Sequence, residues 1–138
     1  MVWLYKRIHH IGIAVKDLDE GLAKYQGQLG FDLEGKETVE SEDVEVAIFK
    51  VGESRIELLH STNSDSVISK FIANRGEGIH HVAVEVDDME RELEELKANG
   101  APVLDDQPRI GAGGHKVAFI HPKGTSGVLL ELIETLKE

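Results

Sequence analysis

The sequence predicts an α+β protein of two tandem β-α-β-β-β modules, mainly because it contains an internal repeat. The segment Ile8–Ile11, with the letters IHHI, returns 71 residues later as Ile79–Val82, with the letters IHHV. Each copy begins a strand-like run, and an acidic amphipathic segment follows it. Because self-similarity at a fixed spacing indicates a duplicated structural unit, we expect two related halves that each supply a similarly placed imidazole.

Module one follows from hydrophobic periodicity and capping residues. Alternation over residues 8–15 predicts a strand, and Leu18 and Tyr25 belong to an apolar stripe at helical spacing. Asp17 or Asp19 can cap the start of that helix. Three further strands are predicted at residues 31–39, 44–51 and 54–60.

Module two repeats this order after a connecting helix. Apolar residues at helical spacing predict that helix at 65–75. A strand at 79–86 and a helix at 88–99 follow, then a short strand near Val103 and two more strands at 116–121 and 128–133. We therefore expect a single domain over 1–138, with module one at 8–62, the connecting helix at 65–75 and module two at 78–135.

Composition favours a folded cytoplasmic protein that binds a small molecule. The chain has 138 residues, 41% hydrophobic content and a formal net charge of -11. Nucleic-acid binding needs clustered Lys and Arg, so this charge argues against a nucleic-acid partner. No apolar run reaches the roughly 20 residues that span a membrane. The first seven residues place basic side chains after apolar ones, which is the wrong order for a secretory signal.

Alternation along the first strand of each module separates two faces. Side chains of a strand point alternately to opposite sides, so large aliphatic residues such as Ile11 and Val82 share one face. His10 and His81 lie on the other face together with small residues. This pattern indicates a sheet with one face under helices and the other open to a ligand.

The last strand of each module carries a glutamate within an apolar run. Glu57 and Glu131 each stand between two large aliphatic residues and face away from their side. A carboxylate buried there without a partner would be costly, and a cation would remove that cost. The chain has no cysteine, so His10, Glu57, His81 and Glu131 form the candidate ligand set. Such nitrogen and oxygen donors suit a divalent metal that leaves positions for a substrate.

Other interpretations of these residues stay open. The plain alternative is two surface glutamates and two packing histidines. His60, His115 and His121 could replace some ligands in another arrangement, although packing in a turn explains His121 well. His9 and His80 fall on the helix-facing side, and we expect them to be structural.

Glu45 breaks the symmetry of the repeat. It shares a face of its predicted strand with Ala47 and Phe49, and Lys116 occupies the matching place in module two. A carboxylate that is not held by the metal can transfer a proton, so Glu45 is a candidate catalytic residue. The glycine-rich segment 111–114 lacks the spacing of a phosphate-binding loop and is interpreted as a turn that lines the site.

These residues resemble the vicinal oxygen chelate (glyoxalase/bleomycin resistance/dioxygenase) superfamily and, within it, the methylmalonyl-CoA epimerases. The likeness covers essentially the whole chain. Segments 10–14 and 78–83 are common across the superfamily, and the run from 111 through His121-Pro122-Lys123 to 132 is similar to the epimerases. The resemblance implies a curved, incomplete eight-stranded barrel around a metal site.

The same resemblance implies an isomerase. It would interconvert (R)- and (S)-methylmalonyl-CoA by proton transfer at the α-carbon, with a divalent metal stabilising the enolate. His10, His81 and Glu131 match the family's metal ligands, and Glu57 matches a place where some epimerases carry Gln. Glu45 and Glu131 match its two acids. The resemblance further implies Co²⁺ first, with Ni²⁺, Mn²⁺ or Zn²⁺ as alternatives, an acyl-CoA substrate and a homodimer.

Two other functions are kept beside this one. A glyoxalase I-type lyase acting on a glutathione hemithioacetal is the runner-up, because Glu57 completes a His-Glu-His-Glu set found in that enzyme. A metal-free binding module is the alternative from another class, and an extradiol dioxygenase fits less well because its iron site uses only one carboxylate.

The phosphates of an acyl carrier would need cations, for which the candidates are Lys70, Arg75, Arg109, Lys116 and Lys123.

Overall fold

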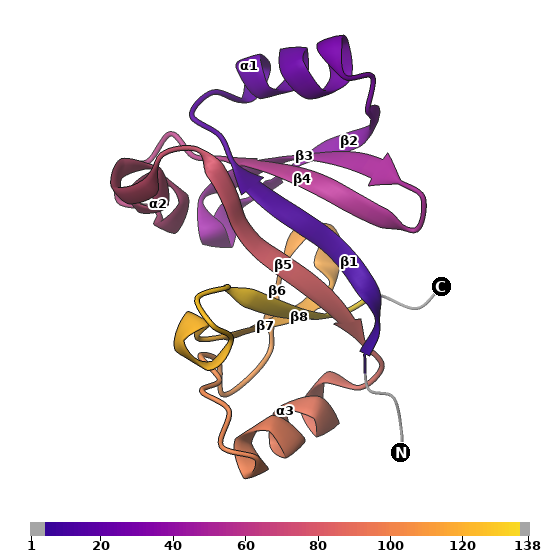
Figure 1. Cartoon of the computed structure of the whole chain (residues 1–138), viewed down its shortest axis with the longest axis vertical. Coiled ribbons are helices and arrows are strands. Elements are labelled where there is room, and N and C mark those ends of the chain that lie inside the picture. The colour runs from indigo at the N-terminus through magenta and orange to yellow at the C-terminus, as the bar shows by residue number, and fades with distance from the viewer. Residues whose placement is uncertain (1–4, 136–138) are drawn as a thin grey trace. The chain divides into compact units, whose positions relative to one another are not determined.

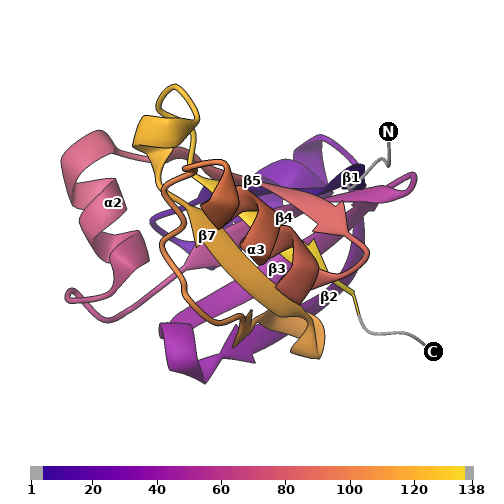
Figure 2. The same cartoon turned by 90° about the horizontal axis from the view of Figure 1, so that it is seen from below.

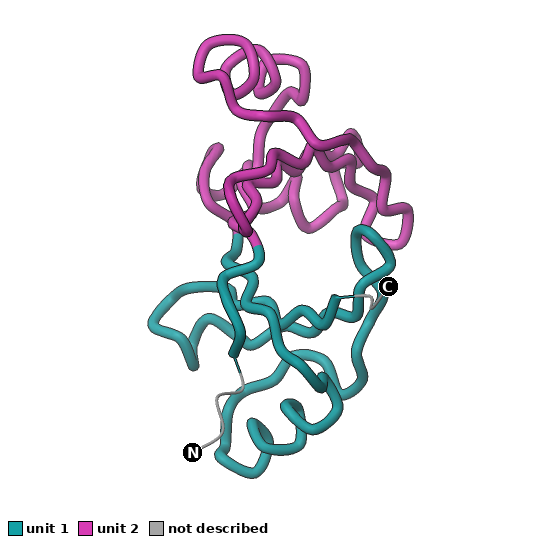
Figure 3. The backbone as a smooth tube through the Cα atoms, turned by 90° about the vertical axis from the view of Figure 1, so that its right-hand side faces the viewer, with its two compact units in different colours: residues 1–9, 81–138 teal, residues 10–80 magenta. Residues whose placement is uncertain are grey.

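The structure of the protein is a computed structural model that describes residues 5–135 (Figure 1). Residues 1–4, part of the stretch weighed above as a secretory signal, lie outside the described residues. The chain divides into two compact units, which Figure 3 colours separately. Unit 1 comprises residues 1–9 and 81–138, and unit 2 comprises residues 10–80. Each unit is described by itself.

Unit 2 combines four strands with two helices. Strand β1 (Tyr5–Ala14) enters it at His10, and the strand order is β2-β3-β4-β1. β1 pairs with β4 in parallel, and the other pairs are antiparallel. The remaining elements are α1 (Leu18–Leu22), the π-helix η1 (Ala23–Gln28), β2 (Asp32–Val39), the short 3-10 helix η2 (Glu40–Glu42), β3 (Val44–Val51), β4 (Ser54–His60) and α2 (Val67–Arg75).

The two faces of the unit 2 sheet pack against different helices. On one face, Phe49 and Leu58 are fully buried, and partly buried apolar side chains of α1 and η1 pack against them. Figure 1 shows this helical segment above β2 to β4. On the other face, Val46 and Leu59 pack with Ile68 of α2. α1 begins where the Asp17 side chain accepts the backbone N–H of Glu20 at 3.0 Å, as an N-cap should.

Unit 1 repeats the same plan. Its strand order is β5-β8-β7-β6, with β5 and β8 parallel. Figure 2 shows α3 lying over β7, and Met89 and Leu93 of this helix pack on Ala118, Ile120 and Leu132 of the sheet. The elements are β5 (Gly78–Val86), α3 (Met89–Ala98), β6 (Arg109–Ile110), the short helix η3 (Ala112–Gly114), β7 (Lys116–Ile120), the short helix η4 (Pro122–Gly124) and β8 (Leu130–Glu134).

The face of the unit 1 sheet away from α3 has a separate, smaller apolar cluster. Ala83, Val117 and Ile133 form it, one from each of β5, β7 and β8. Alternation places His81 and Glu131 on this same side, because each stands two residues from a member of the cluster. We call this side the open face of unit 1.

The α+β class and the paired β-α-β-β-β order are confirmed. The short strand expected near Val103 is wrong: the strand at this edge is β6, and Val103 forms only an isolated bridge with Ile120. Pro102 has no N–H to offer a neighbouring strand, and the N–H of Val103 is used locally by the Ala101 carbonyl at 2.9 Å. The proposed domain and module limits stay predictions.

Among residues 5–135, none of the helices is both long enough and apolar enough to cross a membrane.

Candidate metal centre and active site

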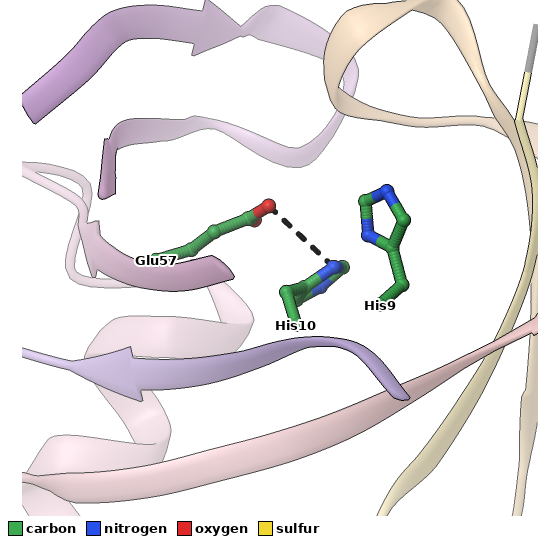
Figure 4. Close-up of side chains that lie close together, drawn as sticks. All are labelled: His9, His10 and Glu57. Atoms are coloured by element: carbon green, nitrogen blue, oxygen red, sulfur yellow. Dashed lines mark ion pairs between the residues drawn. The ribbon is translucent and has the colours of Figure 1, made fainter. Parts of the chain in front are cut away.

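Unit 2 brings His10 and Glu57 together, as the sequence predicts. Gly12 of β1 is the register partner of Glu57 in β4, and His10 lies two residues before it, so the three share one face. The Nδ1 atom of His10 lies 3.5 Å from Oε2 of Glu57. Figure 4 shows these two side chains pointing toward each other, with His9 as the preceding residue of β1. Both are buried, at 3% and 6% exposure.

Unit 1 holds the repeat-related pair, His81 and Glu131. Glu131 of β8 stands between Ala83 of β5 and Phe119 of β7, and His81 is two residues before Ala83 on the same face. The Nε2 atom of His81 lies 3.1 Å from Oε1 of Glu131. The ring of Phe119 meets the His81 ring edge-on, with their centroids 6.1 Å apart. His81 and Glu131 are 5% and 6% exposed.

The chemistry of the two His–Glu pairs fits a divalent metal. Each of the four residues offers a ligand atom, either an imidazole nitrogen or a carboxylate oxygen. A carboxylate with so little contact with water needs a donor or a cation beside it. Zn²⁺, Co²⁺ and similar ions accept this mixture of nitrogen and oxygen ligands. Each unit thus contributes half of the predicted ligand set.

Glu45 lies on a different face from the unit 2 pair. In the register of β3 and β4, Ile48 is opposite Glu57, whereas Glu45 is opposite His60. Glu45 therefore points to the side of Phe49, which is the face covered by α1 and η1. The sequence correctly grouped Glu45 with Phe49, but the structure does not bring it onto the face that carries Glu57. Glu45 is exposed.

Outside the proposed ligand set, His80 and His121 have structural roles. His80 packs edge-on against Phe71 of α2 at a centroid distance of 5.1 Å, as expected of a structural residue. His121 accepts the backbone N–H of Lys123 through Nδ1 at 3.0 Å and stabilises its turn. Among the described residues, Nδ1 of His60 is the buried side-chain nitrogen or oxygen that has no hydrogen-bond partner.

The expectation that His9 faces the helices is wrong. Its ring contacts His115 edge-on, with centroids 5.9 Å apart, and Arg7, two residues before it in β1, binds Glu85. His115 and Glu85 both belong by alternation to the open face of unit 1, through Val117 and Ala83. His9 is buried there, at 4% exposure.

Glu85 lies on the open face of unit 1 with two basic partners that sequence reasoning missed. The Nε atom of Arg7 donates to Oε1 of Glu85 at 2.7 Å, and the Lys6 ammonium lies 3.5 Å from Oε2. Burial alone would raise the pKa of the Glu85 carboxyl, but the hydrogen bond and charge of Arg7, with Lys6, hold this pKa below its ordinary value. A buried acid four residues after His81 is the signal that could have prompted a search for a basic partner.

Comparison with known proteins agrees with this fold. A family model of the Glyoxalase/Bleomycin resistance protein/Dioxygenase superfamily matches residues 9–119. The chain belongs to this superfamily, whose members include enzymes.

The relatives define the group within the superfamily. An ethylmalonyl-CoA/methylmalonyl-CoA epimerase from Cereibacter sphaeroides is 38% identical over 91% of this chain and 96% of its own length. The crystal structure of methylmalonyl-CoA epimerase from Mycobacterium tuberculosis is 33% identical, with a TM-score of 0.93 over 99% of this chain and 94% of that one. A methylmalonyl-CoA epimerase in complex with methylmalonyl-CoA and NH4+ is 37% identical, with a TM-score of 0.90 over 96% of both chains. These likenesses place the chain in the methylmalonyl-CoA epimerase family and confirm the resemblance found in the sequence.

Proposed function

We propose that this protein epimerises methylmalonyl-CoA by proton transfer at the α-carbon. The observation that carries the proposal is the pair of repeat-related His–Glu sites, one buried in each unit. Membership of the epimerase family supports the choice of substrate. Relatives whose alignments cover more than nine-tenths of this chain are named as methylmalonyl-CoA epimerases. An acyl-CoA with a free carboxylate is the substrate class.

The metal would be held by His10, Glu57, His81 and Glu131. All four are buried and offer donors that suit one divalent ion, with Co²⁺ as the first choice and Ni²⁺, Mn²⁺ or Zn²⁺ as alternatives. When bound, such an ion supplies Lewis acidity that stabilises negative charge on the substrate's carbonyl oxygen. The family resemblance and the burial of both glutamates support this assignment.

Proton transfer needs a carboxylate at the open face, and Glu131 is the best candidate. The α-hydrogen of methylmalonyl-CoA lies between a thioester and a carboxylate, so a side-chain base can remove it. Inversion then requires an acid on the opposite side of the α-carbon. The sequence assigned that second role to Glu45. This assignment stays a prediction that follows from the family resemblance, and the register of β3 does not support it.

Incubation with one stereoisomer of methylmalonyl-CoA in deuterium oxide tests the proposal. We expect the metal-loaded protein to introduce deuterium at the α-carbon and to destroy optical purity together. Mass spectrometry follows the exchange, and circular dichroism of the thioester follows the stereochemistry. Protein treated with a chelator is the control. Absence of exchange by fully metal-loaded protein would contradict the proposal.

The same assay measures what Glu45 does. If Glu45 is the second acid, Glu45→Gln should bind metal normally and lose about a hundredfold or more in epimerisation, the usual contribution of a general acid or base. Glu45 is exposed and lies on the same face as Phe49, away from Glu57. We therefore expect a much smaller loss of epimerase activity. A hundredfold loss in a folded, metal-loaded variant would restore the sequence-based assignment.

A glyoxalase I-type lyase remains the second candidate, since it would use the same four donors. Conversion of a glutathione hemithioacetal, without α-exchange of methylmalonyl-CoA, would favour it. A metal-free binding module would instead be recognised by the lack of metal in the purified protein. The homodimer and the cytoplasmic location stay predictions.

A further inference from the structure

Unit 1 carries a cation on the same face of its sheet as His81 and Glu131. Arg109 of β6 is the register partner of Val117 in β7. Phe119, two residues further along β7, is the register partner of Glu131. Because partners across a sheet and residues two apart share a face, Arg109 lies on the open face of unit 1, at the edge strand.

Contacts with Asp105 and Phe119 help to hold the Arg109 side chain in place. Its Nε atom lies 3.1 Å from Oδ1 of Asp105, whose Oδ2 accepts the backbone N–H of Phe119 at 2.8 Å. Its Cζ atom lies 5.4 Å from the centroid of the Phe119 ring, in a cation–π contact. The same ring also contacts the ring of His81 edge-on. Phe119 is therefore shared between the proposed metal ligand and the guanidinium.

Arg109 nevertheless remains accessible to a ligand. Its side chain is 45% exposed, whereas that of Asp105 is 14% exposed. A guanidinium has five N–H donors in a planar fork, so it can serve more than one acceptor. Fixing the side chain beforehand lowers the entropy that binding would otherwise cost.

Other basic side chains of unit 1 are engaged elsewhere. Lys116 points to the helix side, where its Nζ atom lies 3.0 Å from Oε1 of Glu90. Arg7 and Lys6 neutralise the buried Glu85. Among the cations that the sequence offered for an anionic substrate, Arg109 is the one that combines the open face, exposure and a ring shared with His81.

We propose that Arg109 binds an anionic oxygen group of the acyl-CoA substrate and so determines substrate affinity. This inference rests on the proposed epimerase function. Arginine is well suited to the task, because its planar fork makes two parallel hydrogen bonds to a carboxylate or a phosphate. The anion is either the free carboxylate of the acyl group or a phosphate of the carrier. A protein of net charge -11 needs such a fixed cation to hold either one.

The test compares Arg109→Gln and Arg109→Lys with the wild type. The matched control is Arg91→Gln, which makes the same charge change on an exposed residue of α3. A hydrogen-bonded charge contributes about 1.5–3 kcal/mol, so Arg109→Gln should raise KM about tenfold to a hundredfold. We expect kcat to change much less and Arg109→Lys to recover part of the affinity. Unfolding midpoints of all variants confirm that each is folded.

A truncated substrate identifies the anion. Methylmalonyl-pantetheine keeps the carboxylate and the thioester but lacks every phosphate. If Arg109→Gln raises KM for both substrates, Arg109 binds the carboxylate. If it raises KM only for methylmalonyl-CoA, Arg109 binds a phosphate. A KM equal to that of Arg91→Gln for both substrates would overturn the inference.

Calorimetric titration with the same two compounds separates this inference from the proposed function, because it requires no turnover. If the wild type shows no exchange but Arg109→Gln binds methylmalonyl-CoA at least tenfold more weakly than Arg91→Gln, the epimerase proposal fails and the anion site stands. If the wild type epimerises and all variants bind equally, the anion site fails alone.

Discussion

At the scale of single residues, two buried glutamates of unit 1 have opposite effects on stability. Glu85 has Arg7 and Lys6 beside it, and its pKa lies below the ordinary value despite burial. Glu92 of α3 is buried with the like charge of Glu95 nearby, and burial first, then that charge, raises its pKa. The ionised form of Glu85 therefore favours the folded state, whereas the ionised form of Glu92 opposes it.

Glu85→Gln should destabilise the protein at neutral pH. We expect a loss of about 1.5–3 kcal/mol, because a charged hydrogen-bond acceptor is replaced by a neutral one. Since folding lowers the pKa of Glu85, its contribution is present above the ordinary value of 4.5 and is lost as pH falls through the lower, folded-state value. Urea unfolding at pH 7 and at about pH 3 measures the difference. A gap between wild type and variant that does not narrow in acid would contradict this role.

At the scale of elements, the repeat extends into the way each module begins its helix. Asp17 caps α1, and Asp88, 71 residues later, caps α3 by accepting the N–H of Arg91 at 3.2 Å. The helices then diverge at Gly21 and its counterpart Glu92. A Cβ atom at Gly21 would lie 2.9 Å from Cδ1 of Leu58, so the first helix packs too closely on its sheet for a side chain at that position.

Asp88→Ala should lower the free energy of unfolding by about 1 kcal/mol, because an orphan N–H at the start of α3 loses its acceptor. Asp106→Ala is the matched control, since Asp106 has a side chain that is 96% exposed and only a solvent-exposed ion pair with Lys97 at 3.6 Å. We expect the control to stay within about 0.5 kcal/mol of the wild type. Equal effects of the two substitutions in urea unfolding would show that charge, and not the cap, is responsible.

The sequence predicted regular elements well and irregular ones poorly. The bounds of β3 and β4 agree with the expected 44–51 and 54–60, because both are β-rich apolar runs bounded by the acidic stretch around Ser41 and by Gly52-Glu53. β6 has only two residues and no periodicity to detect. The π-helix η1 was also missed, since its i to i−5 bond from Leu29 to Lys24 depends on packing and not on a distinct residue pattern.

At the scale of the whole molecule, the proposal of a single metal makes a prediction about stoichiometry. The wild type should bind one divalent ion per chain, and either His10→Ala or His81→Ala should greatly weaken that binding, because each removes one of the shared donors. Elemental analysis gives the stoichiometry, and the metal-dependent rise in melting temperature reports affinity. If the wild type instead binds two ions per chain and each variant binds one, each His–Glu pair binds a metal ion independently.

The candidate site could be predicted in part because it depends on strand parity. Parity alone paired His10 with Glu57 and His81 with Glu131, and the structure brings each pair within 3.5 Å. It failed for His9, whose ring contacts His115 on the open face of unit 1. It could not rank Arg109 among the cations, because the position of that side chain depends on Asp105, which lies in an irregular segment between α3 and β6.

The limits of the two units differ from the limits of the repeat, and this has a consequence for any attempt to divide the gene. Residues 1–9 belong with 81–138, so the strand that opens the first repeat also serves the second. A cut between α2 and β5 would separate Arg7 from Glu85. The C-terminal fragment would lose both basic partners of Glu85, and removing one side of a buried ion pair costs several kcal/mol. Neither repeat is therefore autonomous, and a split version should regain its fold only when both pieces are expressed together.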